Sequence, residues 1–178
     1  MKLCMIGTGY VGLVSGVCFA DLGNDVICVD RDLNKINKLK KSIIPIYEPG
    51  LNELVKKNSK AGRLKFSTNI AESVLKSNII FICVGTPTRK NKYEADLSQV
   101  YDAAKKISKN IKSFKIIINK STVPVMTGDK VEKIISSQMD RDQKINKADD
   151  VIVNDVEIND LISKIDDIHQ KYIEIADG

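Results

Sequence analysis

The stretch KLCMIGTGYVG at residues 2–12 decides the fold of this chain. Its first five residues predict a short buried strand, and glycines follow at positions 7, 9 and 12. From Tyr10 to Leu22 apolar residues recur with helical periodicity, and Gly23 comes where a helix end is expected. A strand, a glycine-rich turn and a helix in this order predict the first unit of a parallel α/β sheet.

The same alternation continues along the chain. Further strands are expected at 25–29, 64–67, 78–84 and 115–119, and helices at 33–41, 51–58, 70–75, 97–111 and 127–136. Residues 44–50 (IPIYEPG) contain two prolines and are predicted to form a loop. Strands that are continuously apolar indicate a sheet buried on both faces. The predicted fold class is therefore α/β, a doubly wound parallel sheet of the Rossmann kind with right-handed crossovers.

The C-terminal part of the chain differs from this pattern. Residues 137–147 are polar, have no period and are predicted to be a linker between a domain at 1–136 and a tail at 148–178. The tail is expected to add an extra strand at 151–153 and an amphipathic helix at 158–175. Either this strand joins the sheet and the helix covers one face, or the helix exposes an apolar stripe that invites aggregation or a partner.

Composition places the chain among ordinary globular proteins. It has 178 residues, of which 43% are hydrophobic and 29% charged, and no apolar run approaches the roughly 20 residues that span a bilayer. No membrane partner is therefore expected. The formal net charge is +5, but residues 148–178 hold nine acidic residues and two lysines, which leaves 26 basic and 14 acidic residues in 1–147. Aromatic residues make up only 5%, so the lysines are interpreted as a solvated surface and no nucleic-acid partner is expected.

Four cysteines lie at positions 4, 18, 28 and 83, each within an apolar run and none in a Cys-x-x-Cys pair. This pattern predicts buried reduced thiols, with no metal site and no disulfide, in a cytoplasmic protein. The single histidine, His169, falls in the predicted tail helix and is interpreted as a surface residue.

The glycine turn has the spacing and context of a dinucleotide-binding motif. Gly7 would allow the tight turn, Gly9 would let the backbone approach a diphosphate, and Gly12 would let helix and strand pack closely. The free N–H groups and the dipole of the helix start would then face the phosphates. Asp30 ends the next strand, where a carboxylate accepts the ribose hydroxyls of NAD and repels the 2′-phosphate of NADP, although Arg31 beside it weakens that discrimination. The alternative is a glycine turn with a purely structural role.

Five stretches of the chain form a wider pattern: MKLCMIGTGYVGLVSGVCFADLGNDVICVD at 1–30, YEPGLNEL at 47–54, FICVGTP at 81–87, ADLSQV at 95–100 and KSTVPV at 120–125. In this order, and over about residues 1–135, they resemble the NAD-binding domain of the UDP-glucose 6-dehydrogenase family. The resemblance implies NAD as cofactor and a two-step oxidation of UDP-glucose to UDP-glucuronate, which uses two NAD molecules. UDP-glucose is expected as a partner only of a complete enzyme, and no oligomeric state is predicted.

The resemblance also implies site residues. Tyr10 and Val11 in the glycine loop would lie against the cofactor, and Lys35 would lie near its adenosine end. Thr86 and Thr122 follow two predicted strands and would face the cofactor, with Thr122 near the nicotinamide and orienting an active-site water, the one catalytic role expected here. The alternatives are that Lys35 is an ordinary surface lysine and that both threonines cap loops.

Two departures from the family bear on these expectations. Met126 stands where the family usually has glycine, so a long side chain is expected to crowd the nicotinamide end. The resemblance is also expected to end near residue 135, and no cysteine here lies in the family's nucleophile motif. The 178 residues are therefore expected to be incomplete for catalysis.

Residues 135–172 instead resemble the C-terminal end of dephospho-coenzyme A kinase. The similarity lies in SQM at 137–139, in ADDVIVN at 148–154 and in the helix predicted after them. A kinase needs a phosphate-binding loop, which this sequence lacks, so the tail is interpreted as the remnant of a fusion. The alternative function is a non-catalytic nucleotide-binding or interaction module.

Overall fold

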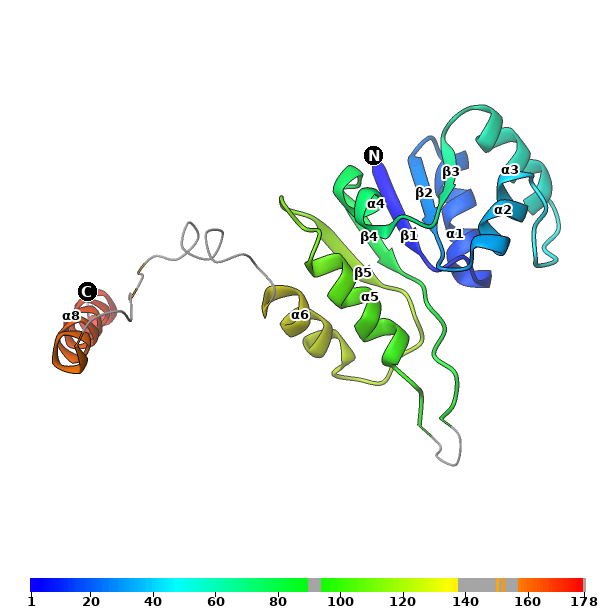
Figure 1. Ribbon diagram of the computed structural model, residues 1–178. Coiled ribbons are helices and arrows are strands. Elements are labelled where there is room, and N and C mark those ends of the chain that lie inside the picture. The colour runs from blue at the N-terminus through cyan, green and yellow to red at the C-terminus, as the bar shows by residue number, and fades with distance from the viewer. Residues whose placement is uncertain (90–93, 138–149, 151, 153–156, 178) are drawn as a thin grey trace. The chain divides into compact units, whose positions relative to one another are not determined.

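The computed structural model describes residues 1–89, 94–137, 150, 152 and 157–177 (Figure 1). Five strands form its sheet: β1 (Lys2–Ile6), β2 (Asp25–Val29), β3 (Leu64–Ser67), β4 (Ile79–Ile82) and β5 (Ile116–Asn119). The helices are α1 (Tyr10–Asp21), α2 (Leu33–Lys40), α3 (Leu51–Lys60), α4 (Ile70–Lys76), α5 (Ser98–Ser108), α6 (Thr127–Ser137) and α8 (Ile158–Asp177). Each predicted strand of the first domain and each predicted helix is confirmed within a few residues at its ends.

All five strands are parallel and lie in the order β3-β2-β1-β4-β5. The chain leaves β1 toward β2 and β3 on one side and later returns to place β4 on the other side. The strand order therefore reverses between β1 and β4, which is where open α/β sheets bind their ligands. This topology confirms the predicted doubly wound Rossmann-like fold.

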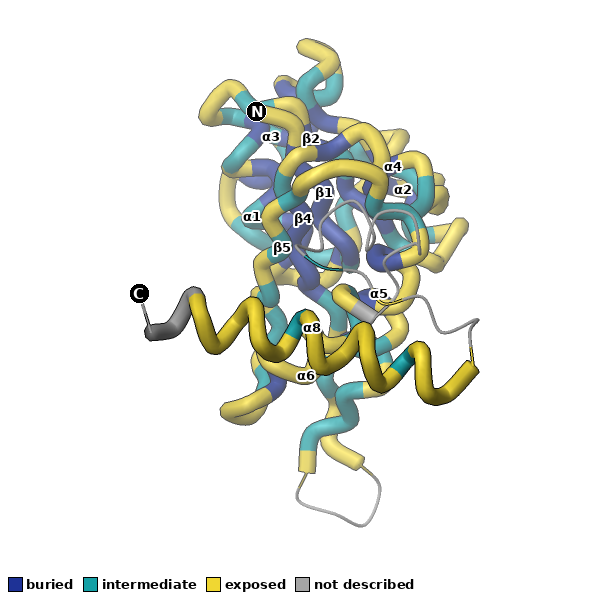
Figure 2. The backbone as a smooth tube through the Cα atoms, turned by 90° about the vertical axis from the view of Figure 1, so that its left-hand side faces the viewer, coloured by how far each residue is buried: buried dark blue, intermediate teal, exposed yellow. Residues whose placement is uncertain are grey.

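Apolar side chains of the strands alternate between two separate core clusters, one on each face of the sheet. Met5 and Cys28 point to the face covered by α1, α2 and α3, whereas Cys4 and Ile80 point to the face covered by α4, α5 and α6. Both faces are thus buried, as continuously apolar strands require. Figure 2 shows β1, β2 and β4 in the buried centre of this domain.

The loops around the sheet are set by short local contacts. Asp32 caps α2 by accepting a hydrogen bond from the Lys35 N–H at 3.1 Å, and Asn69 caps α4 in the same way from the Glu72 N–H. The proline-containing segment before α3 is a loop, as predicted, and ends at Gly50 in the left-handed conformation, with φ +77°.

The chain divides into two compact units, Met1–Met139 and Asp140–Gly178. In the second unit, α8 confirms the predicted tail helix. Asp150 accepts hydrogen bonds from Lys171 and from the Tyr172 hydroxyl, at 2.7 and 2.9 Å. Four apolar residues of the helix are between 45% and 69% exposed: Ile158, Ile162, Ile165 and Tyr172. Residues 151 and 153 of the predicted strand and residues 138–147 of the predicted linker lie outside the described residues.

Candidate functional site

The glycine turn between β1 and α1 packs tightly against the carboxyl end of β4. Gly7 has φ +103°, and a Cβ atom at this position would lie 2.5 Å from the carbonyl oxygen of Cys83. A Cβ atom at Gly12 would lie 1.9 Å from the carbonyl oxygen of Gly7. Gly9, in contrast, has no atom within 4 Å of its Cβ position. Two of the glycines therefore hold the turn against the sheet, and the third leaves open space at the start of α1.

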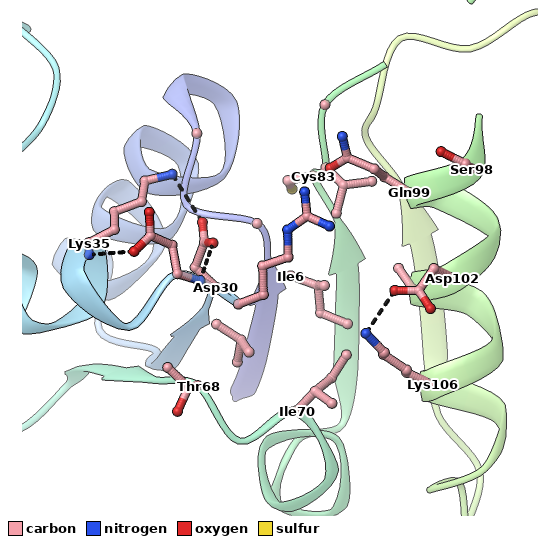
Figure 3. Close-up of a pocket in the computed structure, with 18 residues that line it drawn as sticks. Ile6, Asp30, Lys35, Thr68, Ile70, Cys83, Ser98, Gln99, Asp102 and Lys106 are labelled. Carbon is pink, nitrogen blue, oxygen red and sulfur yellow. Dashed lines mark hydrogen bonds and ion pairs between the residues drawn. The ribbon is translucent and has the colours of Figure 1, made fainter. Parts of the chain in front are cut away.

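A cavity of about 550 Å³ opens beside this turn, at the carboxyl ends of β1, β2 and β4 (Figure 3). One side is formed by Gly7, Gly9 and the end of β2 with Asp30 and Lys35. The other side is formed by α5, from which Gln99, Asp102 and Lys106 line the cavity. This volume lies within the range of small-molecule and cofactor sites. The cavity also lies at the reversal of strand order, where the topology predicts a ligand.

Asp30 is the most heavily hydrogen-bonded side chain at the cavity. Its Oδ2 accepts hydrogen bonds from the Thr8 hydroxyl at 2.7 Å, the Thr8 N–H at 3.0 Å and the Lys35 ammonium at 3.0 Å. Its Oδ1 accepts only the Asp32 N–H, at 3.1 Å. Burial raises the pKa of the Asp30 carboxyl, but these hydrogen bonds from Thr8, Asp32 and Lys35 outweigh it and lower the pKa from 3.8 to about 2. Asp30 is therefore a fixed, ionised carboxylate at the end of β2.

Of the residues that the sequence singles out, Gly7, Gly9, Asp30 and Lys35 line the cavity together. Lys35 forms an ion pair with Asp30 at 3.0 Å, and its role near the adenosine end of a cofactor stays a prediction. Gly12 is buried under the turn.

Tyr10 and Val11 lie at the start of α1 and are 54% and 45% exposed. Neither lines the cavity. The Tyr10 hydroxyl donates a hydrogen bond to Glu48, which ties the glycine turn to the loop before α3. This hydrogen bond raises the pKa of Tyr10, ahead of smaller contributions from desolvation and from the charge of Glu48. Glu48 therefore helps to hold the loop before α3 against the glycine turn.

Thr86 and Thr122 come together at the carboxyl ends of β4 and β5. The Thr86 hydroxyl donates a hydrogen bond to the Thr122 carbonyl oxygen at 2.9 Å. Neither residue lines the 550 Å³ cavity. The structure therefore places the two threonines in contact. The hydrogen bond of Thr86 to a loop carbonyl agrees with its alternative interpretation as a residue that caps a loop.

Sequence reasoning did not single out Thr8 or the residues of α5. Thr8 is fully buried and binds Asp30 through both its hydroxyl and its N–H. Its position between two motif glycines is the only signal that could have pointed to it. Gln99 belongs to the ADLSQV stretch, which carries the family resemblance but was not assigned to a site.

The prediction of four buried cysteines is wrong for one of them. Cys4, Cys28 and Cys83 are buried, and burial raises the pKa of Cys4 to about 12 and that of Cys83 to about 11. Cys18 is exposed, because its place in the helical repeat of α1 turns it away from the sheet. Within the described residues, no group of three or more histidine, cysteine or acidic side chains could hold a metal ion.

Met126 has φ +70°, a backbone conformation that favours glycine. We expect Met126→Gly to raise the free energy of unfolding by about 0.5–1 kcal/mol, because relief of left-handed strain outweighs the entropy cost of glycine. Thermal unfolding followed by circular dichroism measures the change. The control Val125→Gly replaces a neighbour that is 91% exposed and has no positive φ, and it should be neutral or destabilising. A loss of stability in Met126→Gly would show that its side chain contributes packing.

Met126 does not line the cavity, so crowding of a nicotinamide stays a prediction.

The glycine turn, the carboxylate at the end of β2 and the cavity at the strand-order reversal define a dinucleotide-binding domain. The sequence profile described as "UDP-glucose/GDP-mannose dehydrogenase family, NAD binding domain" matches residues 1–170. The chain belongs to this family, and the cofactor of the domain is NAD. The match extends 35 residues past position 135, where the sequence resemblance was expected to end.

Known proteins similar to this chain include dehydrogenases of nucleotide sugars. UDP-glucose 6-dehydrogenase of Rhizobium meliloti is 54% identical over 153 residues, which are 86% of this chain and 33% of that protein. UDP-glucose 6-dehydrogenase TuaD of Bacillus subtilis is 54% identical over 134 residues, or 75% of this chain and 29% of that protein. The chain thus spans about a third of the length of these relatives.

Solved structures show the same relationship. A GDP-mannose dehydrogenase from Pseudomonas aeruginosa matches with a TM-score of 0.74 at 35% identity, over 78% of this chain and 32% of that one. A UDP-glucose dehydrogenase from Pyrobaculum islandicum matches with a TM-score of 0.71 at 34% identity, over 76% of this chain and 32% of that one.

Among the described residues, no helix is both long and apolar enough to cross a membrane.

Proposed function

We propose that this chain is the NAD-binding part of an oxidoreductase that converts UDP-glucose to UDP-glucuronate with two molecules of NAD. The observation that supports it most is the ionised Asp30 carboxylate, held by Thr8 and Lys35 beside the glycine turn. High identity to two UDP-glucose 6-dehydrogenases, and the YEPGL sequence at 47–51, favour UDP-glucose over the other sugar nucleotides of the family.

The residues around the cavity fit the cofactor. Open space at Gly9 and the free N–H groups at the start of α1 suit a diphosphate, because an anion is stabilised at a helix N-terminus. Oδ1 of Asp30 accepts one hydrogen bond and has capacity to accept ribose hydroxyls. Lys35 holds that carboxylate in place from the adenosine side. Bound NAD supplies the hydride acceptor, and the protein residues orient it.

The roles of the remaining residues are part of the proposal. Tyr10 and Val11 start the helix on which the diphosphate rests. Thr86 and Thr122, joined by a hydrogen bond, would lie toward the nicotinamide end, with Thr122 orienting a water molecule during the oxidation.

We further propose that residues 1–178 alone do not complete the oxidation. Three of the four cysteines are buried thiols with a raised pKa, and thiols in that state are poor nucleophiles. Cys18 is exposed on α1 and does not line the cavity. The free thiols support the predicted cytoplasmic location, since reduced cysteines persist in reducing compartments.

A fluorescence titration with NADH tests the cofactor site, and incubation with UDP-glucose and NAD tests the chemistry. We expect saturable NADH binding, weaker NADPH binding and no turnover by the 178 residues. Absence of NADH binding by the folded chain would contradict the cofactor site. Formation of UDP-glucuronate would contradict only the proposal that these residues are insufficient.

The kinase-like origin proposed for residues 135–172 stays a prediction. The family profile extends to residue 170 and does not support it. A non-catalytic module remains the alternative function, and the exposed apolar residues of α8 favour an interaction role for the tail. The NADH titration excludes only an interaction module whose glycine turn is purely structural, because such a turn predicts no binding, whereas a nucleotide-binding module would also bind NADH.

A further inference from the structure

A second cavity, of about 300 Å³, lies at the amino ends of β1, β2 and β3. This is the opposite end of the strands from the dinucleotide cavity. Lys2 comes from the start of β1, Lys65 from β3, and Lys76 and Ser77 from the end of α4. The strand register pairs Lys2 with Asp25 and Ile27 with Lys65, so these side chains point to the sheet face on which α4 lies.

The charge around this cavity is strongly positive. Four cations line it, and Asp25 is the only carboxylate among its lining residues. In the described part of the chain, Lys2 and Lys65 form no ion pair, and Lys76 pairs only with Glu72 on the exposed surface of its own helix. Four cations around a single carboxylate repel one another, and an anion among them would relieve that repulsion.

We propose that this cavity is a second anion site, separate from the dinucleotide site, and that it binds a phosphate or pyrophosphate group. A planar carboxylate is best held by two parallel N–H groups of an arginine. Arg63, the one arginine at the cavity, already donates from Nε to Ala20 and from Nη2 to Asn58. Lysine ammonium groups act as point charges, and several of them together suit an anion that has many oxygens. The proposal does not depend on the function of the first cavity.

Amide chemical shifts in a two-dimensional NMR titration test the proposal at residue resolution. The probe is inorganic pyrophosphate added to the full chain, with sodium chloride adjusted to constant ionic strength. We expect saturable shifts at Lys65 and at residues 76–78, in addition to any at the glycine turn, where helix N–H groups also attract phosphate. Because the two sites lie at opposite ends of the strands, their shifts are separable.

Two variants and one control make the outcome decisive. Lys65→Met and Lys76→Met should each weaken the affinity measured at residues 76–78 about tenfold, since each removes a cation that lines the cavity. Neither should alter the shifts at Gly9 and Val11. The control Lys112→Met removes an exposed lysine that does not line the cavity and should leave the affinity unchanged. Shifts confined to the glycine turn, shifts spread over all lysines, or equal affinity in Lys65→Met and the control would each overturn the proposal.

Discussion

Replacing Gly12 with alanine is expected to lower the free energy of unfolding by at least about 3 kcal/mol. The added Cβ atom would lie 1.9 Å from the carbonyl oxygen of Gly7 and 3.0 Å from the Cβ atom of Cys83. The nearest atom belongs to the backbone of the turn, so no side chain can rotate away and α1 itself must move from the sheet. Overpacking of a rigid site costs 1–3 kcal/mol and more where backbone has to shift. Thermal unfolding should show a midpoint lower by roughly 10 °C.

Gly9→Ala is the matched control for this variant. Its Cβ atom would meet nothing within 4 Å, and its φ of −70° is open to alanine. Alanine is a poorer N-cap than glycine, so the stability should fall by no more than about 1 kcal/mol. NADH affinity should nevertheless fall, because the methyl group occupies the space through which a diphosphate approaches the turn. Equal destabilisation by the two variants would contradict the division between a packing glycine and a binding glycine.

These two glycines show what a sequence motif can predict and where it stops. The spacing of Gly7, Gly9 and Gly12 after a strand indicates the turn and even the different role of each glycine. That is possible because a motif of this kind reflects local backbone geometry, which neighbouring residues determine. The predicted strands of residues 1–136 and the predicted helices are confirmed for the same reason, since their periodicities are local properties.

Contacts between distant segments could not be predicted in this way. The side of the cavity formed by α5 depends on how the chain crosses from β4 to β5, and nothing in Gln99 or Asp102 indicates it. Thr8 lies in the motif, yet its bond to Asp30 joins residues 22 positions apart. Cys18 falls in an apolar run, but the pitch of α1 places it on the exposed side. The second cavity likewise depends on the register of the strands. Lys2 and Lys65 line the same cavity only because β1, β2 and β3 pair with one another in this register.

Replacing Asp30 with alanine is expected to weaken NADH binding at least about tenfold and to reduce the preference for NADH over NADPH. The carboxylate that would accept ribose hydroxyls is lost, and Arg31 and Lys35 remain as two cations that favour a 2′-phosphate. The variant should also lose about 2–3 kcal/mol of stability, since the buried Thr8 hydroxyl is left without its acceptor. Fluorescence titrations with both cofactors, together with chemical denaturation, measure the two effects separately.

Asp30→Asn keeps the shape of this side chain and removes its charge. The dependence of the unfolding free energy on pH then measures what the charge contributes. The folded-state pKa of Asp30 is about 2, below its ordinary value of 3.8, so the ionised carboxylate stabilises the folded state at any pH above about 4. That contribution, about 2 kcal/mol, is lost as the pH falls from about 4 through 2. The difference in unfolding free energy between the native chain and Asp30→Asn should therefore be constant from pH 5 to 7 and should shrink as the pH falls toward 2. A difference that stays the same over this range would mean that the hydrogen bonds from Thr8 and Lys35 to this side chain do not depend on its charge, which would contradict the lowered pKa of Asp30.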